Sequence, residues 1–303
     1  MRLSHVVLDF DGTCTRVEAT QELYLQHYKE LLAASAGEDF AAGWDEGWAL
    51  VQARSPEAAW TTLGRAPAAP ANADPYIAAG EIVGWLERRW RASGRELPPI
   101  PKDLYKRAYA SAEAPWRDEV VPTLEALVAL GPRVTFVSNS ATATIAHRLD
   151  ALLADRPDLR SRIRVFGDAN KYVVKELSWD GEPLPEALEA QFGALPAAAA
   201  GIEGLRRPVY LRRGDYFHAL CKVWDDDPGA AAETIVCGDI YELDLAMPAA
   251  LGCHVHLVTR AAPHATCDYE LGAVAALGAR GGVSDDLHAL VARVRAVALM
   301  AHV

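Results

Sequence analysis

The sequence predicts an α/β protein, with a doubly wound parallel sheet and a helical cap domain inserted into it. Four short apolar runs, rich in β-branched residues, each end at a turn signal or a polar side chain. Continuous apolar runs of this length are typical of strands in a parallel sheet that is covered on both faces. Patterns of helical period lie between them, and this alternation implies right-handed crossovers. The predicted strands are 5–8, 133–137, 234–237 and 254–258, and the helices between them include 122–130, 141–153 and 245–251.

A long helical block follows the first strand, from about residue 17 to residue 117. It has no convincing apolar strand, and it holds six of the eight tryptophans. Trp44 and Trp48 are spaced to share one face of a helix, which indicates core packing within a separate subdomain. An Ala/Pro tract at 66–71 divides the block and is typical of a semi-rigid linker.

A second block interrupts the alternation between residues 168 and 211. Two short runs there, 172–174 and 208–211, are candidate strands, and we expect a small lid insertion. The segment from Ser284 onward predicts a capped closing helix. The resulting domain prediction is a catalytic core of residues 1–15 and 118–303, with the possible lid at 168–211, and a helical cap of residues 16–117.

Composition excludes several classes of function. Thirty basic and 41 acidic residues give a net charge of -11, which disfavours nucleic acid and anionic membranes as partners. No run approaches the roughly 18 apolar residues of a membrane span, and carboxylates stand where a signal peptide keeps its apolar run, so we expect a cytoplasmic protein. The five cysteines include no C-x-x-C pair, which argues against a disulfide framework and a structural zinc site.

Polar side chains follow three of the predicted strands, where each strand ends. Because ligands bind at the carboxyl edge of an open parallel sheet, these side chains are candidates for one site. Each pair alone would more often cap a helix or form a turn. Their occurrence together at successive strand ends indicates a functional site. They are Asp9 and Asp11, Ser138 and Asn139, and Asp239 with Asp244.

These motifs resemble the haloacid dehalogenase (HAD) superfamily in its phosphatase branch. The resemblance lies in the sequences Asp9-Phe10-Asp11-Gly12-Thr13, Ser138-Asn139 and Gly238-Asp239-Ile240-Tyr241-Glu242-Leu243-Asp244, and it covers the predicted core. It implies a Rossmann-like core with a cap inserted after the first motif. It also implies that Asp9 is the nucleophile, forming an aspartyl phosphate, and that Asp11 is the general acid and base.

A divalent cation is expected beside these carboxylates. A phosphate monoester and an attacking carboxylate repel each other, and Mg²⁺ offsets such charge while binding through one or two carboxylates and the phosphate. Asp9 and Asp239, at neighbouring strand ends, would supply those carboxylates. The resemblance implies a further ligand from the backbone carbonyl of Asp11, with Asp244 supporting the site.

Phosphate binding is expected from Ser138 and Asn139, which can donate hydrogen bonds to phosphoryl oxygens. The Thr13 hydroxyl could position the acid or hold the loop. The family normally has a lysine before its last acidic motif, and the nearest equivalent by position is Arg213, which can hold phosphate bidentately. Four other cations stay open for this role: Arg212, Lys171, Lys175 and Lys222.

The leading hypothesis is a Mg²⁺-dependent phosphatase acting on a small phosphorylated metabolite. Asp11 separates this branch from the dehalogenases, which need no second acid at that position, and a large cap would exclude bulky substrates. Two alternatives stay open: a phosphomutase acting on a sugar phosphate, and a non-catalytic protein that binds a small molecule. The substrate, the cap residues that contact it and the oligomeric state are open at this stage.

Overall fold

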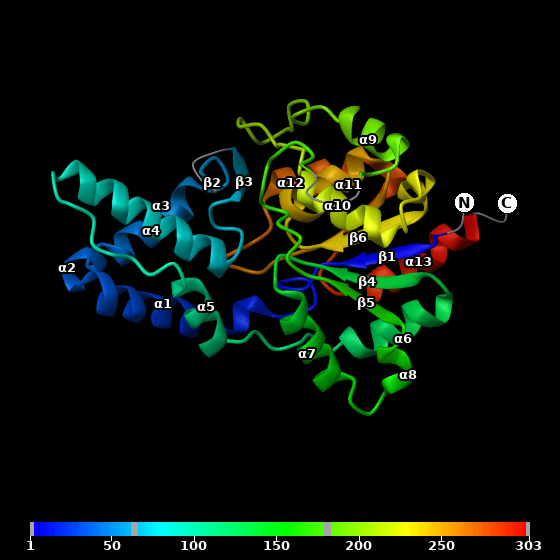
Figure 1. Ribbon diagram of the computed structural model, residues 1–303, viewed down its shortest axis with the longest axis horizontal. Helices are drawn as coiled ribbons and strands as arrows, with labels where there is room; N and C mark the ends of the chain where they lie inside the picture. Colours follow the sequence, from blue (N-terminus) through cyan, green and yellow to red (C-terminus); the bar gives the residue numbers. More distant parts are fainter. Residues whose placement is uncertain (1–2, 62–65, 179–182, 301–303) are drawn as a thin grey trace.

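The computed structural model describes residues 3–61, 66–178 and 183–300. Its core is a six-stranded, fully parallel sheet in the order β5-β4-β1-β6-β7-β8. The predicted α/β class with a doubly wound sheet is therefore confirmed. In Figure 1 the strand arrows point toward the cap. The strands are β1 (His5–Leu8), β4 (Arg133–Val137), β5 (Ile163–Phe166), β6 (Thr234–Gly238), β7 (His254–Val258) and β8 (Gly281–Ser284).

The centre of the sheet is β1, which pairs with β4 on one side and β6 on the other. Leu8 is in register with Phe136 of β4 and with Cys237 of β6. The chain segments that continue these three strands, beginning at Asp9, Ser138 and Asp239, therefore leave the sheet side by side. This register brings the three sequence motifs to one edge.

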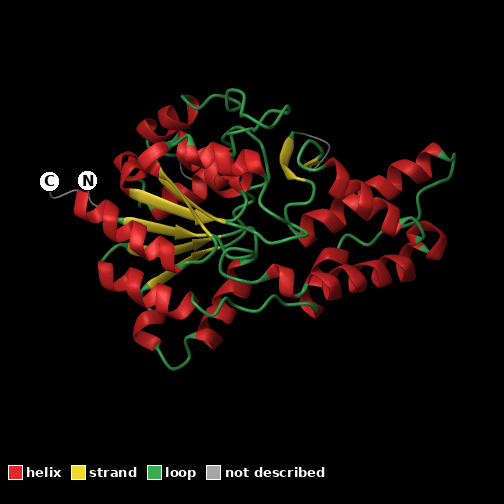
Figure 2. Ribbon diagram, turned by 180° about the vertical axis from the view of Figure 1, so that it is seen from behind, coloured by secondary structure: helices red, strands yellow, loops and turns green. Residues whose placement is uncertain are grey.

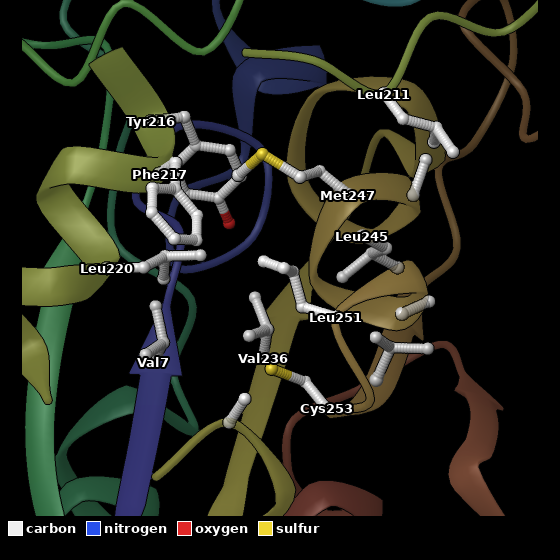
Figure 3. Packing of buried hydrophobic residues seen from close by; sticks show 14 of the residues in the cluster. Val7, Leu211, Tyr216, Phe217, Leu220, Val236, Leu245, Met247, Leu251 and Cys253 are labelled. Atoms are coloured by element: carbon white, nitrogen blue, oxygen red, sulfur yellow. The ribbon is translucent and has the colours of Figure 1, made fainter. Parts of the chain in front are cut away.

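Helices cover both faces of the sheet, as Figure 2 shows. Side chains alternate along β1, because Val7 packs into one buried cluster and Val6 and Leu8 into the other. Figure 3 shows the first cluster, where Val7 lies beneath Phe217 and Leu220 of α10, and Val236 lies beside Leu251. The core helices are α6 (Val120–Leu130), α7 (Thr142–Leu152), α8 (Pro157–Arg160), α9 (Glu186–Gly193), α10 (Gly214–Val223), α11 (Ala246–Ala250), α12 (Asp268–Ala275) and α13 (His288–Met300).

Two strands of the parallel sheet were not predicted, and both lie at its edges. β5 alternates apolar residues with Arg164 and is half exposed over most of its length, while β8 begins with two glycines. Neither has the continuous apolar run that marks a strand buried on both faces.

The cap is mainly helical and has its own core. Buried side chains from several helices, including Trp44, form one cluster, and Trp48 packs against it. Figure 1 shows this layer beside the carboxyl edge of the sheet. The cap helices are α1 (Gln21–Ala36), α2 (Glu38–Ala41), α3 (Trp44–Arg54), α4 (Pro75–Ala92) and α5 (Leu104–Ser111).

The Ala/Pro tract of the cap is not a linker, and the cap is not wholly helical. Residues Ala59–Thr61 form β2, which pairs antiparallel with β3, Pro67–Pro70. Ala68 and Ala69 are fully buried against Ile240 and Leu243 of the core. Small alanine side chains allow this close approach, and a two-stranded ribbon tolerates prolines that a central strand would not.

The segment 168–211 contains neither of the strands predicted there. Its described residues form only isolated bridges, Lys175 with Arg213 and Ala198 with Tyr210, besides helix α9. Leu188 and Phe192 of α9 are buried in the same cluster as α10. The α9 part of the segment thus packs onto the core. Residues 179–182 of the predicted insertion lie outside the described residues.

The cap is joined to the core where the two connecting segments lie side by side. Thr15 forms an antiparallel bridge with Trp116. Arg16 N donates to Pro115 O over 2.8 Å, and Arg117 N donates to Cys14 O over 3.0 Å. This pairing lies close to the predicted boundaries at residues 16 and 117.

In the part of the chain that the structure describes, no helix is both long enough and apolar enough to cross a membrane.

Candidate active site

A cavity of about 240 Å³ lies between the carboxyl edge of the sheet and the cap. Its core side is formed by residues that follow β1, β4 and β6, together with Tyr172. Its cap side comes from β2, α4 and α5. The lining residues from the core are Asp9, Asp11, Ser138, Asn139, Ser140, Tyr172, Asp239, Ile240, Leu243 and Asp244, and those from the cap are Trp60, Asp74, Tyr76, Ile77 and Tyr105.

Asp9 continues the line of β1 and is held there by the backbone, because its N–H donates to Cys237 O of β6 over 2.9 Å. Its side chain is 8% exposed. Lys171 Nζ lies 2.6 Å from Asp9 Oδ1 and 2.9 Å from Asp244 Oδ1. Burial raises the pKa of Asp9 to about 7; the Lys171 charge opposes this rise, and the Asp244 charge adds to it.

Lys171 is the cation of this site. Its side chain is 1% exposed. Burial alone would lower the pKa of this lysine, but the carboxylates of Asp244 and Asp9 outweigh it and raise the pKa, so the ammonium stays charged. The residue before it, Asn170, has a left-handed backbone (φ 46°), as does Asp168 (φ 55°). These two residues, of types that tolerate this conformation, turn the chain after β5 toward the site.

The structure does not place Arg213 in this role. Its side chain is fully buried, and it donates to backbone carbonyls: Lys171 O, Ala68 O over 2.8 Å and Tyr210 O over 3.2 Å. Arg213 therefore lies behind Lys171 and is absent from the cavity lining. Burial lowers its pKa to about 10. Sequence position favoured Arg213 because it directly precedes α10, whereas Lys171 reaches the site through an irregular loop.

The other candidate cations lie elsewhere. Lys175 pairs with Asp215 at 2.6 Å, and Arg212 pairs with Glu176 at 3.0 Å. Lys222 lies near the end of α10, outside the cavity lining.

Three buried carboxylates, those of Asp9, Asp239 and Asp244, gather at the core side of the cavity. One oxygen from each lies within 4.8 Å of the others. Asp239 Oδ2 is buried and has no hydrogen-bond partner among the described residues. Burial raises the pKa of Asp239 well above its usual range; Arg260 opposes this rise, and Asp244 and Asp9 add to it.

This donor set fits a hard divalent cation such as Mg²⁺. Three carboxylates face one ammonium, so the cluster keeps an excess of negative charge in a buried setting, and one oxygen of Asp239 is unsatisfied. Carboxylate oxygen is the ligand type that Mg²⁺ prefers. Asp244 is held by two donors, Lys171 Nζ and Ile240 N, the second at 3.0 Å from Oδ2.

Thr13 and Gly12 hold the carboxylates in place. Thr13 is fully buried, and its Oγ1 lies 3.1 Å from Asp9 Oδ2 and 3.2 Å from Asp239 Oδ1. Gly12 has a φ of +82°, and a Cβ there would lie 2.3 Å from Asp239 Oδ2. The loop thus needs glycine both for its conformation and for its close approach. Thr13 contacts carboxylates and is not a lining residue of the cavity.

Asp11 is held from both sides of the cavity. Ser140 Oγ of the core donates to Asp11 Oδ2 over 2.5 Å, and Tyr109 Oη of the cap donates to Asp11 Oδ1 over 3.0 Å. Burial raises the pKa of Asp11 although both hydrogen bonds act to lower it. Neither partner was predicted from the sequence. Ser140 could have been found, because it follows the Ser138-Asn139 motif directly, whereas nothing in the sequence marks Tyr109.

Ser138 and Asn139 line the cavity as expected. Ser138 Oγ accepts a hydrogen bond from Ser140 N over 3.2 Å. Asn139 Oδ1 accepts from Lys171 N over 2.7 Å, so this side chain also holds the loop that carries the lysine.

A second pair of residues missed by the sequence analysis supports Asp239 from behind. The Arg260 guanidinium donates to the carbonyl of Asp239 and pairs with Glu270 at 2.5 Å. Glu270 is fully buried and accepts from Tyr241 N over 3.0 Å. This network anchors the loop after β6.

No protein-family model matches the chain, and no curated protein matches it either. Solved structures that resemble it include the putative HAD-hydrolase YfnB from Bacillus subtilis bound to magnesium, at 13% identity and a TM-score of 0.47, covering 96% of this chain and 97% of that chain. A haloacid dehalogenase-like family hydrolase from Xanthomonas campestris has 12% identity and a TM-score of 0.47, covering 99% and 94%. L-2-haloacid dehalogenase from Xanthobacter autotrophicus has 16% identity and a TM-score of 0.44, covering 97% and 98%.

Proposed function

We propose that this protein is a Mg²⁺-dependent phosphatase of the HAD type, which hydrolyses a small phosphate monoester through an aspartyl phosphate on Asp9. The observation that carries the proposal is the pairing of two carboxyl groups with different surroundings in one cavity. Asp9 lies against Lys171 and the acidic cluster, whereas Asp11 is held by two neutral hydroxyl groups. Such a pair suits a nucleophile and a general acid.

The first half of the reaction joins the substrate to Asp9. A carboxylate oxygen of Asp9 forms a bond to phosphorus while the bond from phosphorus to the ester oxygen breaks. The ester oxygen leaves with that electron pair and takes the proton of Asp11, so that an alcohol departs. The raised pKa of Asp11 favours the protonated form that this step needs.

The second half restores the protein. Asp11, now a carboxylate, takes a proton from a water molecule as that water attacks phosphorus. The bond between phosphorus and the Asp9 oxygen breaks, which releases inorganic phosphate. Tyr109 and Ser140 hold the Asp11 carboxyl in position through both halves.

Metal binding is assigned to Asp9, Asp239 and the backbone carbonyl of Asp11, with Asp244 and Thr13 holding these groups in place. A bound Mg²⁺ would offset the negative charge shared by the carboxylates and the phosphate. Lys171 contributes a fixed positive charge at the same place. Ser138 and Asn139 are proposed to donate hydrogen bonds to the phosphoryl oxygens.

The test is hydrolysis of p-nitrophenyl phosphate with Mg²⁺ and with EDTA. We expect Mg²⁺-dependent release of one phosphate per nitrophenol, and a loss of at least about a thousandfold in kcat for Asp9→Asn. Asp45→Asn is the matched control, because Asp45 is an exposed cap residue paired with Lys29. Calorimetric titration gives an independent measure: Asp239→Asn should weaken Mg²⁺ binding by about tenfold or more.

Three results would contradict the proposal. Metal-independent release of chloride from 2-chloropropionate would indicate a dehalogenase. Isomerisation of a sugar phosphate without release of phosphate would indicate a mutase. Equal inertness of the wild type and Asp9→Asn over a broad panel of phosphate esters would indicate a binding protein.

A further inference from the structure

Among the described residues, the cap side of the cavity carries aromatic rings and a single charged group. Three of its five lining residues are aromatic, Trp60, Tyr76 and Tyr105, and Tyr172 of the core joins them. The Trp60 and Tyr172 ring centroids are 5.0 Å apart, and those of Tyr76 and Tyr105 are 6.1 Å apart. The rings thus form two pairs on the cavity lining, and the Tyr76 ring lies 5.3 Å from that of Tyr109, which contacts Asp11.

The one charged side chain among them is Asp74. It precedes α4, and its Oδ1 accepts a hydrogen bond from Ile77 N over 2.6 Å, which explains its presence as a helix cap. Capping does not explain its place in the cavity lining, because serine, threonine or asparagine would cap equally well without a charge. Asp74 forms no ion pair within the described ranges, although burial penalises its charge.

The described lining of the cavity carries an excess of negative charge. Asp74 joins Asp9, Asp11, Asp239 and Asp244 around the cavity, and no described lining residue is a lysine, arginine or histidine. Lys171 is engaged with Asp9 and Asp244 on the core side. A substrate with a second anionic group at the cap end would therefore meet Asp74, and Arg260, the described cation whose charge acts on Asp74, is already paired with Glu270. A substrate with a positive charge there would meet one carboxylate and several aromatic faces.

From this arrangement we infer that the substrate is a phosphate monoester of an amino alcohol, whose ammonium group lies between Asp74 and the aromatic rings. The inference rests on the proposed phosphatase function and names the substrate class of that site. Aromatic faces attract cations through the ring quadrupole, most strongly when the cation has lost its water, and a nearby carboxylate adds direct attraction. The ester phosphate would lie at the other end, against Lys171 and the acidic cluster.

The experiment compares esters that differ only in charge. Phosphocholine is paired with its neutral carbon isostere 3,3-dimethylbutyl phosphate, and 2-aminoethyl phosphate is paired with propyl phosphate. We expect kcat/KM to favour the cationic member of at least one pair by about tenfold or more. Asp74→Asn, which keeps an oxygen for the helix cap, should reduce that ratio about tenfold toward unity.

Asp227→Asn is the matched control, because Asp227 also caps a helical turn, through Gly229 N at 2.8 Å, and is not a lining residue of the cavity. It should leave the ratio unchanged. Hydrolysis of p-nitrophenyl phosphate is measured in parallel, so that failure of the phosphatase proposal is distinguished from failure of this inference. If nitrophenyl phosphate is hydrolysed but neither pair shows a preference for the cation, the inference is wrong and the phosphatase function stands. A preference for a carboxylate-bearing ester such as phosphoglycolate would overturn it in the same way.

Discussion

The core side and the cap side of the cavity differ in charge and in how their side chains are held. On the core side, Asp9, Asp239 and Asp244 are buried and joined by Lys171 and Thr13, directly after strands of one parallel sheet. The cap side presents large rings, which contact one another in pairs. In the proposed reaction, the sheet positions the groups that make and break bonds, and the inserted segment selects the alcohol part of the ester.

Removing the cation of the core side should have the largest effect. Lys171→Met would leave Asp9 and Asp244 facing each other without a positive charge, so we expect kcat/KM for nitrophenyl phosphate to fall by at least about a hundredfold. Lys171→Arg keeps the positive charge, and it tests whether the loss of activity comes from the missing charge or from a folding defect alone. Steady-state kinetics and thermal unfolding of each variant are the measurements.

Lys175→Met is the control for this change, because Lys175 pairs with the half-buried Asp215 outside the cavity lining. It should keep activity within about threefold of the wild type. Similar losses for Lys171→Met and Lys175→Met, with unaltered unfolding, would contradict the assignment of Lys171 as the site cation.

Asp11 accepts one hydrogen bond from a hydroxyl group of the core and one from a hydroxyl group of the cap. Removing each in turn compares the two sides of the cavity. Ser140→Ala and Tyr109→Phe each remove one hydrogen bond, at 2.5 Å and 3.0 Å respectively. We expect kcat to fall about tenfold for each, with the larger loss for Ser140→Ala because its hydrogen bond is shorter. The effect should vanish in an Asp11→Asn background if both residues act through Asp11. Undiminished losses in that background would instead assign them a separate role.

The smallest expected effect is on stability, and it concerns the cap side. Burial raises the pKa of Asp74 to about 7, so between about pH 4 and pH 7 the folded protein holds a proton that the unfolded chain releases. Its contribution to the free energy of unfolding therefore falls as pH rises through that window. Asp74→Asn removes this pH dependence. The free energy of unfolding of the variant, relative to that of the wild type, should therefore increase by about 1 kcal/mol or more between pH 4.5 and pH 7.5.

Urea unfolding at several pH values measures this difference, and Asp227→Asn again serves as the control. Subtracting the wild-type curve removes the contributions of the buried histidines, which act with the opposite sign. Burial lowers the pKa of His256 and His264 to about 4. A stability difference between Asp74→Asn and wild type that stays constant across the range would contradict the assignment of this pH dependence to Asp74.

The sequence predicts the central part of the fold because buried parallel strands leave a strong local pattern. β1, β4, β6 and β7 are rich in apolar residues and are buried almost throughout, and the register of the first three brings the Asp9, Ser138 and Asp239 motifs to one edge. The edge strands and the β2–β3 ribbon lack that pattern. The Ala/Pro tract forms β3 because of what it packs against, namely Ile240 and Leu243, and no local signal reveals such a contact.

The residues of the candidate site also fall into two groups, those that the sequence predicts and those that it does not. Residues that follow strands directly were found from sequence, whereas Lys171 and Tyr109 arrive from an irregular loop and from the cap. Position along the chain favoured Arg213, but the described structure places its guanidinium on backbone carbonyls. Long-range contacts decide these cases, since 162 positions, including the whole cap, separate Lys171 from Asp9 in the sequence.

The short antiparallel bridge between Thr15 and Trp116 bears on how such a protein can evolve. Because the chain leaves the core and returns to it at adjacent positions, the inserted segment can be a few residues or a whole folded unit. The entropic cost of closing such a loop grows only slowly with its length. The strand order and the acidic cluster do not depend on what is inserted there. In the proposed reaction, another inserted unit would change the contacts to the alcohol part of the ester and the Tyr109 contact to Asp11, while Asp9, Asp239 and Asp244 stay with the sheet.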